Sequence, residues 1–503
     1  MDTISDKSIQ EAGHELSKHL WDIALKPWDS TILPSVEQLS RARESLVSSL
    51  PEAGLGFDKT RNHLIDDIVP GLNASSISPN YYGFVTGGVT PAALLADNIV
   101  SAYDQNVQVH LPDHSVATDV EFYALGLLLD LFNLDRKVWV HATTTTGATA
   151  SNILGLACGR EYVLRNAVQR KGGELRSAGE HGVIEVMHAA GLKGLQVLST
   201  LPHSSLGKAA GILGIGRANV KSIPAQGHPL IFDLQRLEEE LARPDVASIV
   251  AMSYGEVNTG WFVTQGIEEA REIRRLCDMY GAWLHVDGAF GIFGRVLKDS
   301  PEFERIKKGC EGIELADSIT GDAHKLLNVP YDCGFFFSRH ANLAEDVFRN
   351  PNAAYLSGGS TTGVIPSPLN IGIENSRRFR ELPVYASLVA YGRDGYRDMV
   401  ERQTRLSRSI AGWVFDHPAY ETLPSGQSRD ELLENTFVIV LLRAKDEALN
   451  AELGKRINAT EKVFVSGTSW EGQPACRIAI SNWRVNEKQD FAIVKEVLEE
   501  VAK

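Results

Sequence analysis

Cysteine, basic residues and long apolar runs are all scarce in this 503-residue chain, and each shortage excludes a class of protein. The five cysteines are dispersed and form no Cys-x-x-Cys pair, so we expect neither a zinc site nor a disulfide framework. There are 50 basic residues against 64 acidic ones, giving a formal net charge of −14. A chain without a basic excess cannot neutralise many phosphates, which argues against a nucleic-acid partner.

No membrane-spanning or secretory segment is evident in the sequence. The longest apolar strand-like run, Phe437 to Leu442, is far too short to cross a bilayer. The segment from Met1 to Lys7 lacks the basic region and the apolar region of a secretory signal. An odd number of dispersed thiols fits a reducing compartment, so we expect a cytoplasmic protein.

What is present is an ordinary globular composition, with 43% hydrophobic and 23% charged residues, in a chain long enough for two or three domains. Apolar spacing near the helical period predicts two helices at the start, over residues 8–25 and 35–50. From about residue 94, helical segments such as 234–241 and 267–280 alternate with apolar, β-rich runs. These expected strands are 138–140, 196–198, 248–252, 282–286 and 334–337. Apolar strands separated by helices indicate an α/β fold with a mostly parallel sheet covered on both faces.

The pattern changes after about residue 372. A helix over 387–415 is followed by strands at 436–442 and 475–480 and by a closing helix over 490–501, which is typical of a separate α+β domain. We therefore expect a helical N-terminal segment over residues 1–93, a large domain over 94–372 and a small α+β domain over 373–503.

Two segments of the expected large domain point to chemistry. In AWLHVDGAF (282–290) an apolar strand runs into Asp287, and in DSITGDAHKLLNVPYD (317–332) Lys325 follows a histidine in an apolar setting. A desolvated lysine is readily deprotonated and can hold an aldehyde as a Schiff base. A buried aspartate needs a partner and can keep a pyridine nitrogen protonated. The pair predicts a pyridoxal 5′-phosphate (PLP) enzyme; the alternatives are a structural salt bridge for Asp287 and a solvated surface position for Lys325.

A phosphate cradle is predicted in TTTTGATASN (143–152), directly before helix-like residues. Small and hydroxyl-bearing residues at a helix N-terminus let backbone N–H groups converge on a dianion. Such a cluster is also an ordinary helix cap, and it favours a phosphate site only in combination with Lys325. His203, in TLPHSSLGK (200–208), precedes an amphipathic helix and could stack on the cofactor ring, although a polar cap is the alternative.

Together these motifs resemble the group II PLP-dependent amino-acid decarboxylases, a family that includes the aromatic-L-amino-acid, glutamate, histidine and diaminobutyrate decarboxylases. The resemblance lies in HK followed by NVPYDCG, in the HVDGA strand end, and in PHSS ahead of KAA. It extends from about Ser78 to the segment that begins at Glu374, and more faintly to residues 477–482. It implies PLP fold type I, similar to aspartate aminotransferase, in a homodimer with active sites at the subunit interface.

The resemblance also implies residue roles. Lys325 would carry the cofactor, His203 would stack on its ring, and Asp287 would hold the pyridine nitrogen. Tyr355, on a loop after the lysine, would return a proton to the substrate α-carbon in the neighbouring subunit, which favours simple decarboxylation over the aldehyde-forming variants. These four residues are the predicted catalytic set, and no metal is expected. The predicted cofactor-binding set is Gly147, Ala148, Thr149, His203, Asn258, Asp287, Ala289, Asp322, His324 and Lys325.

Two positions depart from the family pattern. Many members have asparagine three residues before the lysine, whereas this chain has Asp322, and an acid near a phosphate is repulsive unless it is protonated or turned away. After the lysine stands Leu326, where aromatic-specific members usually carry tryptophan.

The expected substrate pocket contains Phe84, Val85 and Thr86, with Val107 and Val109 approaching from the partner subunit. These positions carry no cation for a side-chain carboxylate, so an aromatic L-amino acid (Trp, Tyr, Phe or dihydroxyphenylalanine) is the expected substrate, converted to its amine and CO₂. The alternatives are a polar substrate (Glu, diaminobutyrate or His) and an aldehyde synthase or lyase on the same scaffold. A non-catalytic homologue is a further alternative, against which the intact catalytic set argues.

Overall fold

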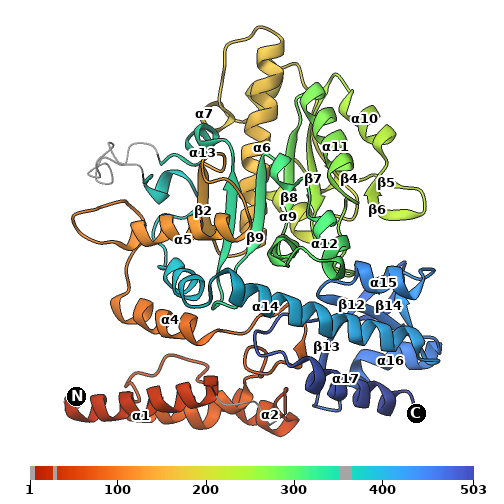
Figure 1. Ribbon diagram of the computed structural model, residues 1–503. Helices are drawn as coiled ribbons and strands as arrows, with labels where there is room; N and C mark the ends of the chain where they lie inside the picture. The colour runs from red at the N-terminus through yellow and green to blue at the C-terminus, as the bar shows by residue number, and fades with distance from the viewer. Residues whose placement is uncertain (1–5, 26–30, 351–364) are drawn as a thin grey trace.

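The computed structural model describes residues 6–25, 31–350 and 365–503 (Figure 1). A seven-stranded sheet forms its centre. In spatial order the strands are β2 (His141–Thr145), β10 (Gly334–Ser338), β9 (Ser318–Asp322), β8 (Trp283–Asp287), β7 (Val246–Ser253), β3 (Gly194–Ser199) and β4 (Val220–Ser222). Strand β10 is antiparallel to both of its neighbours and the other pairs are parallel. The expected α/β fold with a mostly parallel sheet is therefore confirmed.

Helices cover both faces of this sheet (Figure 1). One apolar cluster lies beneath α6 (Ala148–Arg170), α8 (Val183–Ala189), α9 (Ser204–Ile212) and α13 (Ala341–Phe348). A larger cluster lies on the opposite face, beneath α5 (Ala117–Leu131), α10 (Leu234–Leu241), α11 (Ile267–Tyr280) and the first half of α14 (Glu381–Asp416). Strand β8 alternates between the two, because Trp283 packs in the first cluster while Leu284 and Val286 pack in the second.

A second sheet has the order β1-β13-β14-β12-β11. Its strands are β1 (Tyr81–Tyr82), β13 (Phe464–Trp470), β14 (Gln473–Ala479), β12 (Ile439–Ala444) and β11 (Tyr420–Leu423). Helices α15 (Arg429–Asn435), α16 (Glu447–Asn458) and α17 (Glu487–Val501) belong to the same part of the chain. Figure 1 shows α14 running from the side of α4 and α5 to these C-terminal elements.

The remaining elements are short or peripheral. They are α1 (Asp6–Leu25), α2 (Val36–Ser45), α3 (Phe57–Asn62), α4 (Pro91–Tyr103), α7 (Ala178–His181), α12 (Glu304–Gly309) and a hairpin of β5 (Pro224–Ala225) and β6 (His228–Phe232). No helix in the described ranges is both long and apolar enough to cross a membrane.

One predicted strand is wrong. Val138 and Trp139 form a turn in which both amides donate to the Asp135 carbonyl, and β2 begins only at His141. Their apolar character is explained by packing, because Trp139 is buried in the larger cluster from this turn. The expected boundaries at residues 93 and 372 stay predictions; β1, which lies in the expected N-terminal segment, pairs with β13 of the C-terminal sheet.

Candidate active site

The carboxyl ends of β2, β3, β7, β8 and β9 converge on a cavity of about 420 Å³. This is the edge at which open α/β sheets bind ligands, because the loops that follow parallel strands gather there. Most of the site residues predicted from the sequence line it. They are Phe84, Val85, Gly147, Ala148, Thr149, His203, Asp287, Ala289, Asp322, His324 and Lys325.

Lys325 lies in the turn after β9, with its side chain largely withdrawn from solvent. Its Nζ is 2.8 Å from Asp322 Oδ2 and 5.6 Å from the centre of the Phe290 ring. The other Asp322 oxygen, Oδ1, accepts a 2.6 Å hydrogen bond from Ala148 N and lies 3.6 Å from His324 Nε2. Asp322 therefore joins the lysine to the first turn of α6, with His324 beside it.

The start of α6 forms the predicted cradle. Ala148, Thr149 and Ala150 occupy its first turn, where backbone N–H groups have no acceptor within the helix. A Cβ added to Gly147 would lie 3.2 Å from His324 Cε1 and 3.3 Å from Asp322 Oδ1, so the absence of a side chain keeps this space open. The arrangement can hold an anion at the helix N-terminus.

Asp287 ends β8 and faces the cavity while remaining 6% exposed. Its Oδ2 accepts a 2.9 Å hydrogen bond from Asn152 Nδ2, and its Oδ1 accepts one of 3.3 Å from Ala289 N. These two donors orient the carboxylate, whose oxygens can also accept a hydrogen bond from a ring N–H.

His203 caps α9 at the end of the β3 loop, with its ring exposed to the cavity. Removal from bulk water by the cavity walls lowers its pKa, while the nearby Asp287 carboxylate acts in the opposite direction. Burial likewise lowers the pKa of His324, against the opposing influence of Asp322. Both rings are therefore neutral at ordinary pH.

Some predicted residues do not line the cavity. Thr86 is buried, with its hydroxyl donating to the Gly83 carbonyl. Val107 is fully buried in a small cluster of its own chain with Val100, Ala117 and Phe379, and Val109 on the same segment is half-buried. The Asn258 side chain accepts a hydrogen bond from Thr468 Oγ1. Tyr355 lies outside the described residues.

The cavity also contains a residue that the sequence reasoning missed. Arg477, on β14, lines the wall and is 7% exposed. Its Nη1 donates to the Val257 carbonyl, and its buried Nε has no hydrogen-bond partner among the described residues. Burial lowers its pKa, and Glu256 raises it. The available signal was a lone arginine within the apolar strand ACRIAI (475–480), because a buried charge in such a strand needs a partner.

Two further lining residues, Phe84 and Val85, have a strained backbone. Phe84 and Val85 have φ values of 59° and 60°, a conformation that side chains disfavour, above all β-branched ones. Strain of this kind persists where the surroundings enforce it, often beside a ligand site. It leaves Val85 buried and the Phe84 ring 65% exposed at the cavity mouth.

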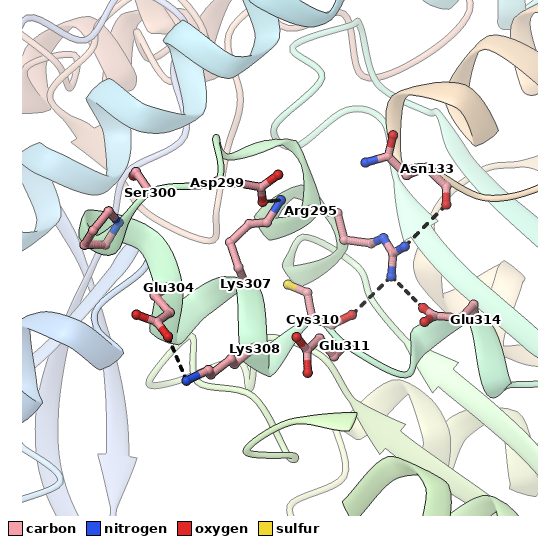
Figure 2. A pocket seen from close by; sticks show the side chains of 11 residues that line it. Asn133, Arg295, Asp299, Ser300, Glu304, Lys307, Lys308, Cys310, Glu311 and Glu314 are labelled. Carbon is pink, nitrogen blue, oxygen red and sulfur yellow. Dashed lines mark hydrogen bonds and ion pairs between the residues drawn. The ribbon is translucent and has the colours of Figure 1, made fainter. Parts of the chain in front are cut away.

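A hollow of about 540 Å³ elsewhere on the surface carries no comparable chemistry. Figure 2 shows that its charged groups already pair with each other: Arg295 with Glu314, Lys308 with Glu304, and Lys307 with Asp299, the last at 2.8 Å. A ligand there would have to displace partners that are already satisfied.

Comparison with known proteins identifies the chemistry of the cavity. Residues 41–426 match the family model described as the pyridoxal-dependent decarboxylase conserved domain. The chain belongs to this family. It is a PLP-dependent carboxy-lyase that acts on an amino acid.

The similar proteins differ in substrate. This decarboxylase is 27% identical to tryptophan decarboxylase 1 of Oryza sativa subsp. japonica, over 90% of this chain and 85% of that one. It is 24% identical to aspartate 1-decarboxylase of Aliivibrio fischeri, over 75% and 67% of the two chains. The solved structure of Oryza sativa TDC with PLP and tryptamine aligns over 100% of this chain and 99% of that one, with a TM-score of 0.81 and 22% identity.

The residues of the decarboxylase cavity fit PLP. A lysine amine, a charged aspartate at the end of a buried strand and the open first turn of a helix surround one space, matching the aldehyde, ring nitrogen and phosphate of the cofactor. Asp322 would oppose the charge of a phosphate bound at the first turn of α6, and it forms an ion pair with Lys325.

Proposed function

We propose that this decarboxylase converts an aromatic or other large apolar L-amino acid to its amine and CO₂, in a site completed by a second copy of the chain. The main support for this substrate class is the apolar character of the cavity wall. The wall is apolar at Phe84, Val85, Leu201, Val257 and Phe290. Such surfaces favour a ring over a charged or strongly polar side chain.

The distribution of cations supports the same substrate class. Among the described lining residues, Lys325 and Arg477 are the lysine and arginine side chains. Lys325 would hold the cofactor, so Arg477, whose buried Nε has no partner in the described part of the chain, would bind the α-carboxylate. No further lysine or arginine in this lining then remains for a side-chain carboxylate, whose desolvation would be costly.

The proposal gives a role to each of four parts of the site. When bound, PLP supplies an aldehyde that captures the substrate amine and a ring that takes up the electron pair left by CO₂. Asp287 would hold the proton on the ring nitrogen, and the first turn of α6 would bind the phosphate. Arg477 would bind and orient the substrate carboxylate. Tyr355, from the partner, would deliver a proton to the α-carbon.

The exposed surface supports a dimer. On α4 the side chains of Leu95, Ile99 and Tyr103 form an apolar stripe at helical spacing, and each is at least 41% exposed. Phe122 and Tyr123 of α5 are also exposed. Contiguous exposed apolar side chains are typical of a protein interface, and we propose that this surface meets a second copy.

The test of the substrate is mass-spectrometric product analysis of the protein with PLP and a panel of Trp, Tyr, Phe, dihydroxyphenylalanine, His, Glu, Asp and diaminobutyrate. We expect an amine from one or more aromatic substrates and none from the Lys325→Ala variant. An amine only from an acidic or basic substrate would overturn the apolar pocket. An aldehyde would overturn the role of Tyr355.

The role of Arg477 is tested with Arg477→Met beside Arg443→Met. Arg443 lies on the neighbouring strand β12 and pairs with Glu421, and it does not line the cavity. We expect the first variant to raise KM for the amino acid at least tenfold, as for the loss of a buried charged hydrogen bond, and the second to leave KM unchanged. Equal effects would remove Arg477 from the substrate site.

The shared site is tested by mixing two variants, Lys325→Ala and Tyr355→Phe, neither of which we expect to form the amine by itself. Amine formation is the activity that is followed. If each site takes its lysine from one chain and its tyrosine from the partner, reassembled heterodimers contain one intact site and recover part of the activity. If the mixed dimers form no amine, both residues belong to one chain and the shared site is wrong.

A further inference from the structure

A continuous set of hydrogen-bonded polar side chains runs between β8, β9, α6 and α9, from the buried interior to His203 at the cavity. Its members are Trp283, Ser318, His285, Asn152, Ser205 and His203, which we call the polar chain, with Asp287 as a branch from Asn152. Asn152, His285 and Ser318 are fully buried. The hydrogen bonds along it measure 3.0, 2.7, 2.9, 2.9 and 2.7 Å, and the Asn152–Asp287 bond measures 2.9 Å.

The packing of α6 explains why this set is buried. Gly155 and Gly159 lie on the face of α6 above β8, and an added Cβ would come within 2.4 Å of His285 and 2.7 Å of Trp283. The two glycines let both rings fit beneath the helix. Ser318 lies opposite His285 in the β8–β9 register.

The chemistry of the end groups fixes which atom donates and which accepts in each hydrogen bond of the polar chain. The Asp287 carboxylate only accepts, so the Asn152 group that faces it is the amide NH₂, and the Asn152 carbonyl faces His285. A carbonyl also only accepts, so His285 Nε2 carries a hydrogen. Complete burial lowers the pKa of His285 to about 4, so its ring is neutral and Nδ1 is bare. Ser318 then donates to Nδ1 and accepts from Trp283, whose indole N–H is a donor only.

The same reasoning fixes the other end. The second Asn152 amide hydrogen goes to Ser205 Oγ, which leaves the Ser205 hydroxyl hydrogen for His203 Nδ1 at 2.7 Å. The Ser205 backbone N–H also donates to His203 Nδ1, at 3.2 Å, and a backbone amide cannot reverse its role. His203 Nδ1 is therefore an acceptor, and the hydrogen of the neutral ring lies on Nε2.

We propose that Asn152 and Ser205 are positioning residues that hold His203 as the neutral Nε2–H tautomer while anchoring Asp287 as a carboxylate. His203 then takes part in catalysis as a hydrogen-bond donor to the substrate or cofactor, and not as a base at Nε2. The Asn152 amide thereby orients both Asp287, by a direct hydrogen bond, and His203, through Ser205. The bearing on catalysis rests on the proposed function, whereas the tautomer itself does not.

The test is a long-range ¹H–¹⁵N spectrum of the full-length protein labelled at the histidine ring nitrogens, with PLP and without it. The His203 signals are assigned by their loss in His203→Gln. We expect a protonated Nε2 and a bare Nδ1 at neutral pH. A protonated Nδ1, or a cationic ring at neutral pH, would overturn the proposal.

The matched variants are Ser205→Ala, Ser205→Thr and Ser204→Ala. Ser204 is the exposed neighbour in the same turn and is not part of the polar chain. In Ser205→Ala we expect a mixture of tautomers and a His203 titration midpoint raised by about one pH unit, roughly the effect of one lost hydrogen bond. Ser205→Thr should restore the wild-type signature and Ser204→Ala should not change it.

The other charges around His203 are common to all variants, so the comparison isolates Ser205. They are Asp287 after β8, Asp322 and Lys325 after β9, and Arg477 on β14. If Ser205→Ala retains the wild-type tautomer and midpoint, the positioning role of Ser205 is wrong, because the backbone N–H would then suffice.

Asn152→Leu extends the test and should raise the titration midpoint of His203 as Ser205→Ala does. If the midpoint and tautomer of His203 are unchanged in a folded Asn152→Leu protein, Asn152 is not a positioning residue. If the wild-type protein shows the expected His203 tautomer but does not decarboxylate aromatic amino acids, the proposed function is wrong and the positioning role stands.

Discussion

A single oxygen atom distinguishes Asp322 from the asparagine that many related decarboxylases carry, and the structure shows what that oxygen contacts. Oδ1 occupies the Ala148 N–H at the start of α6, and Oδ2 lies 2.8 Å from the Lys325 ammonium. The carboxylate therefore contacts both the lysine and the helix N-terminus at which a phosphate would lie.

We expect Asp322→Asn to bind PLP more tightly, by about fivefold, since one repulsive interaction of about 1 kcal/mol is removed. The asparagine oxygen can still accept from Ala148 N–H. Fluorescence titration with PLP gives the dissociation constants, and pyridoxal, which lacks the phosphate, is the control. A gain that is equally large for pyridoxal would show that the effect does not come from the phosphate.

A second prediction at the scale of one residue concerns Gly155. Its replacement by alanine should reduce the free energy of unfolding by about 1–3 kcal/mol, because the new Cβ would lie 2.4 Å from His285 Cε1. Gly207→Ala on α9 is the matched control, since no atom lies within 4 Å of its added Cβ. It should stabilise the helix by up to about 1 kcal/mol. Thermal or denaturant unfolding measures both, and a stabilised Gly155→Ala protein would contradict the packing of His285 under α6.

At the scale of elements, a buried charge cluster fixes the start of α14 against α5. Arg377 and Glu121 form a 2.6 Å ion pair in which both side chains are at most 5% exposed, and Glu381, the first residue of α14, is buried beside them. Burial raises the pKa of Glu381 well above its usual value, with the Glu121 charge acting in the same direction, so Glu381 is held protonated.

Breaking this pair should be costly because it leaves a buried carboxylate without its counter-charge. We expect Arg377→Met to lower the free energy of unfolding by about 3–5 kcal/mol, and Glu121→Gln combined with Arg377→Met to recover most of that loss. The adjacent Arg378 pairs with Asp97 at the surface, so Arg378→Met should cost less than about 1 kcal/mol. Denaturant unfolding of the four proteins separates these cases, and an equal cost for Arg377 and Arg378 would contradict the cluster.

The sequence was informative about elements wherever the signal was local. Apolar runs predicted β3, β7, β8 and β10, and the polar residues that end β8 and β9 led directly to Asp287 and Lys325. The wall of the cavity depends on distant contacts. Nothing local indicates that β1 pairs with β13 or that Arg477 lines the same cavity as Lys325. Val107 could not be placed either, because its apolar side chain fits a core as well as a pocket.

At the scale of the whole molecule, stability should depend on pH through buried histidines. His141 is 2% exposed and burial lowers its pKa to about 4, as for His285. The unfolded chain binds these protons near pH 6.5 and the folded chain only near pH 4, so stability is present above pH 6.5 and is lost as the pH falls towards 4. Each histidine should account for about 3 kcal/mol of that loss.

His141→Phe tests this linkage. The variant loses the hydrogen bond to the Ile371 carbonyl, so the comparison is of pH slopes and not of absolute stability. Between pH 7 and pH 4 the wild type should lose about 3 kcal/mol more than the variant in denaturant unfolding. Parallel curves would show that His141 is protonated equally in both states.

The pairing of β1 with β13 has a consequence for how the enzyme is made. The residues at the floor of the cavity, from Gly147 to Lys325, emerge from the ribosome while β13 and β14 are still unsynthesised. Phe84 and Val85 follow β1 directly, and β1 acquires its partner strand only when residues 464–465 appear. Because long-range strand pairing waits for both partners, a nascent chain can assemble its central sheet early and yet lack the wall that carries Phe84 and Arg477. Catalytic competence therefore arrives only after β13 and β14 have been synthesised.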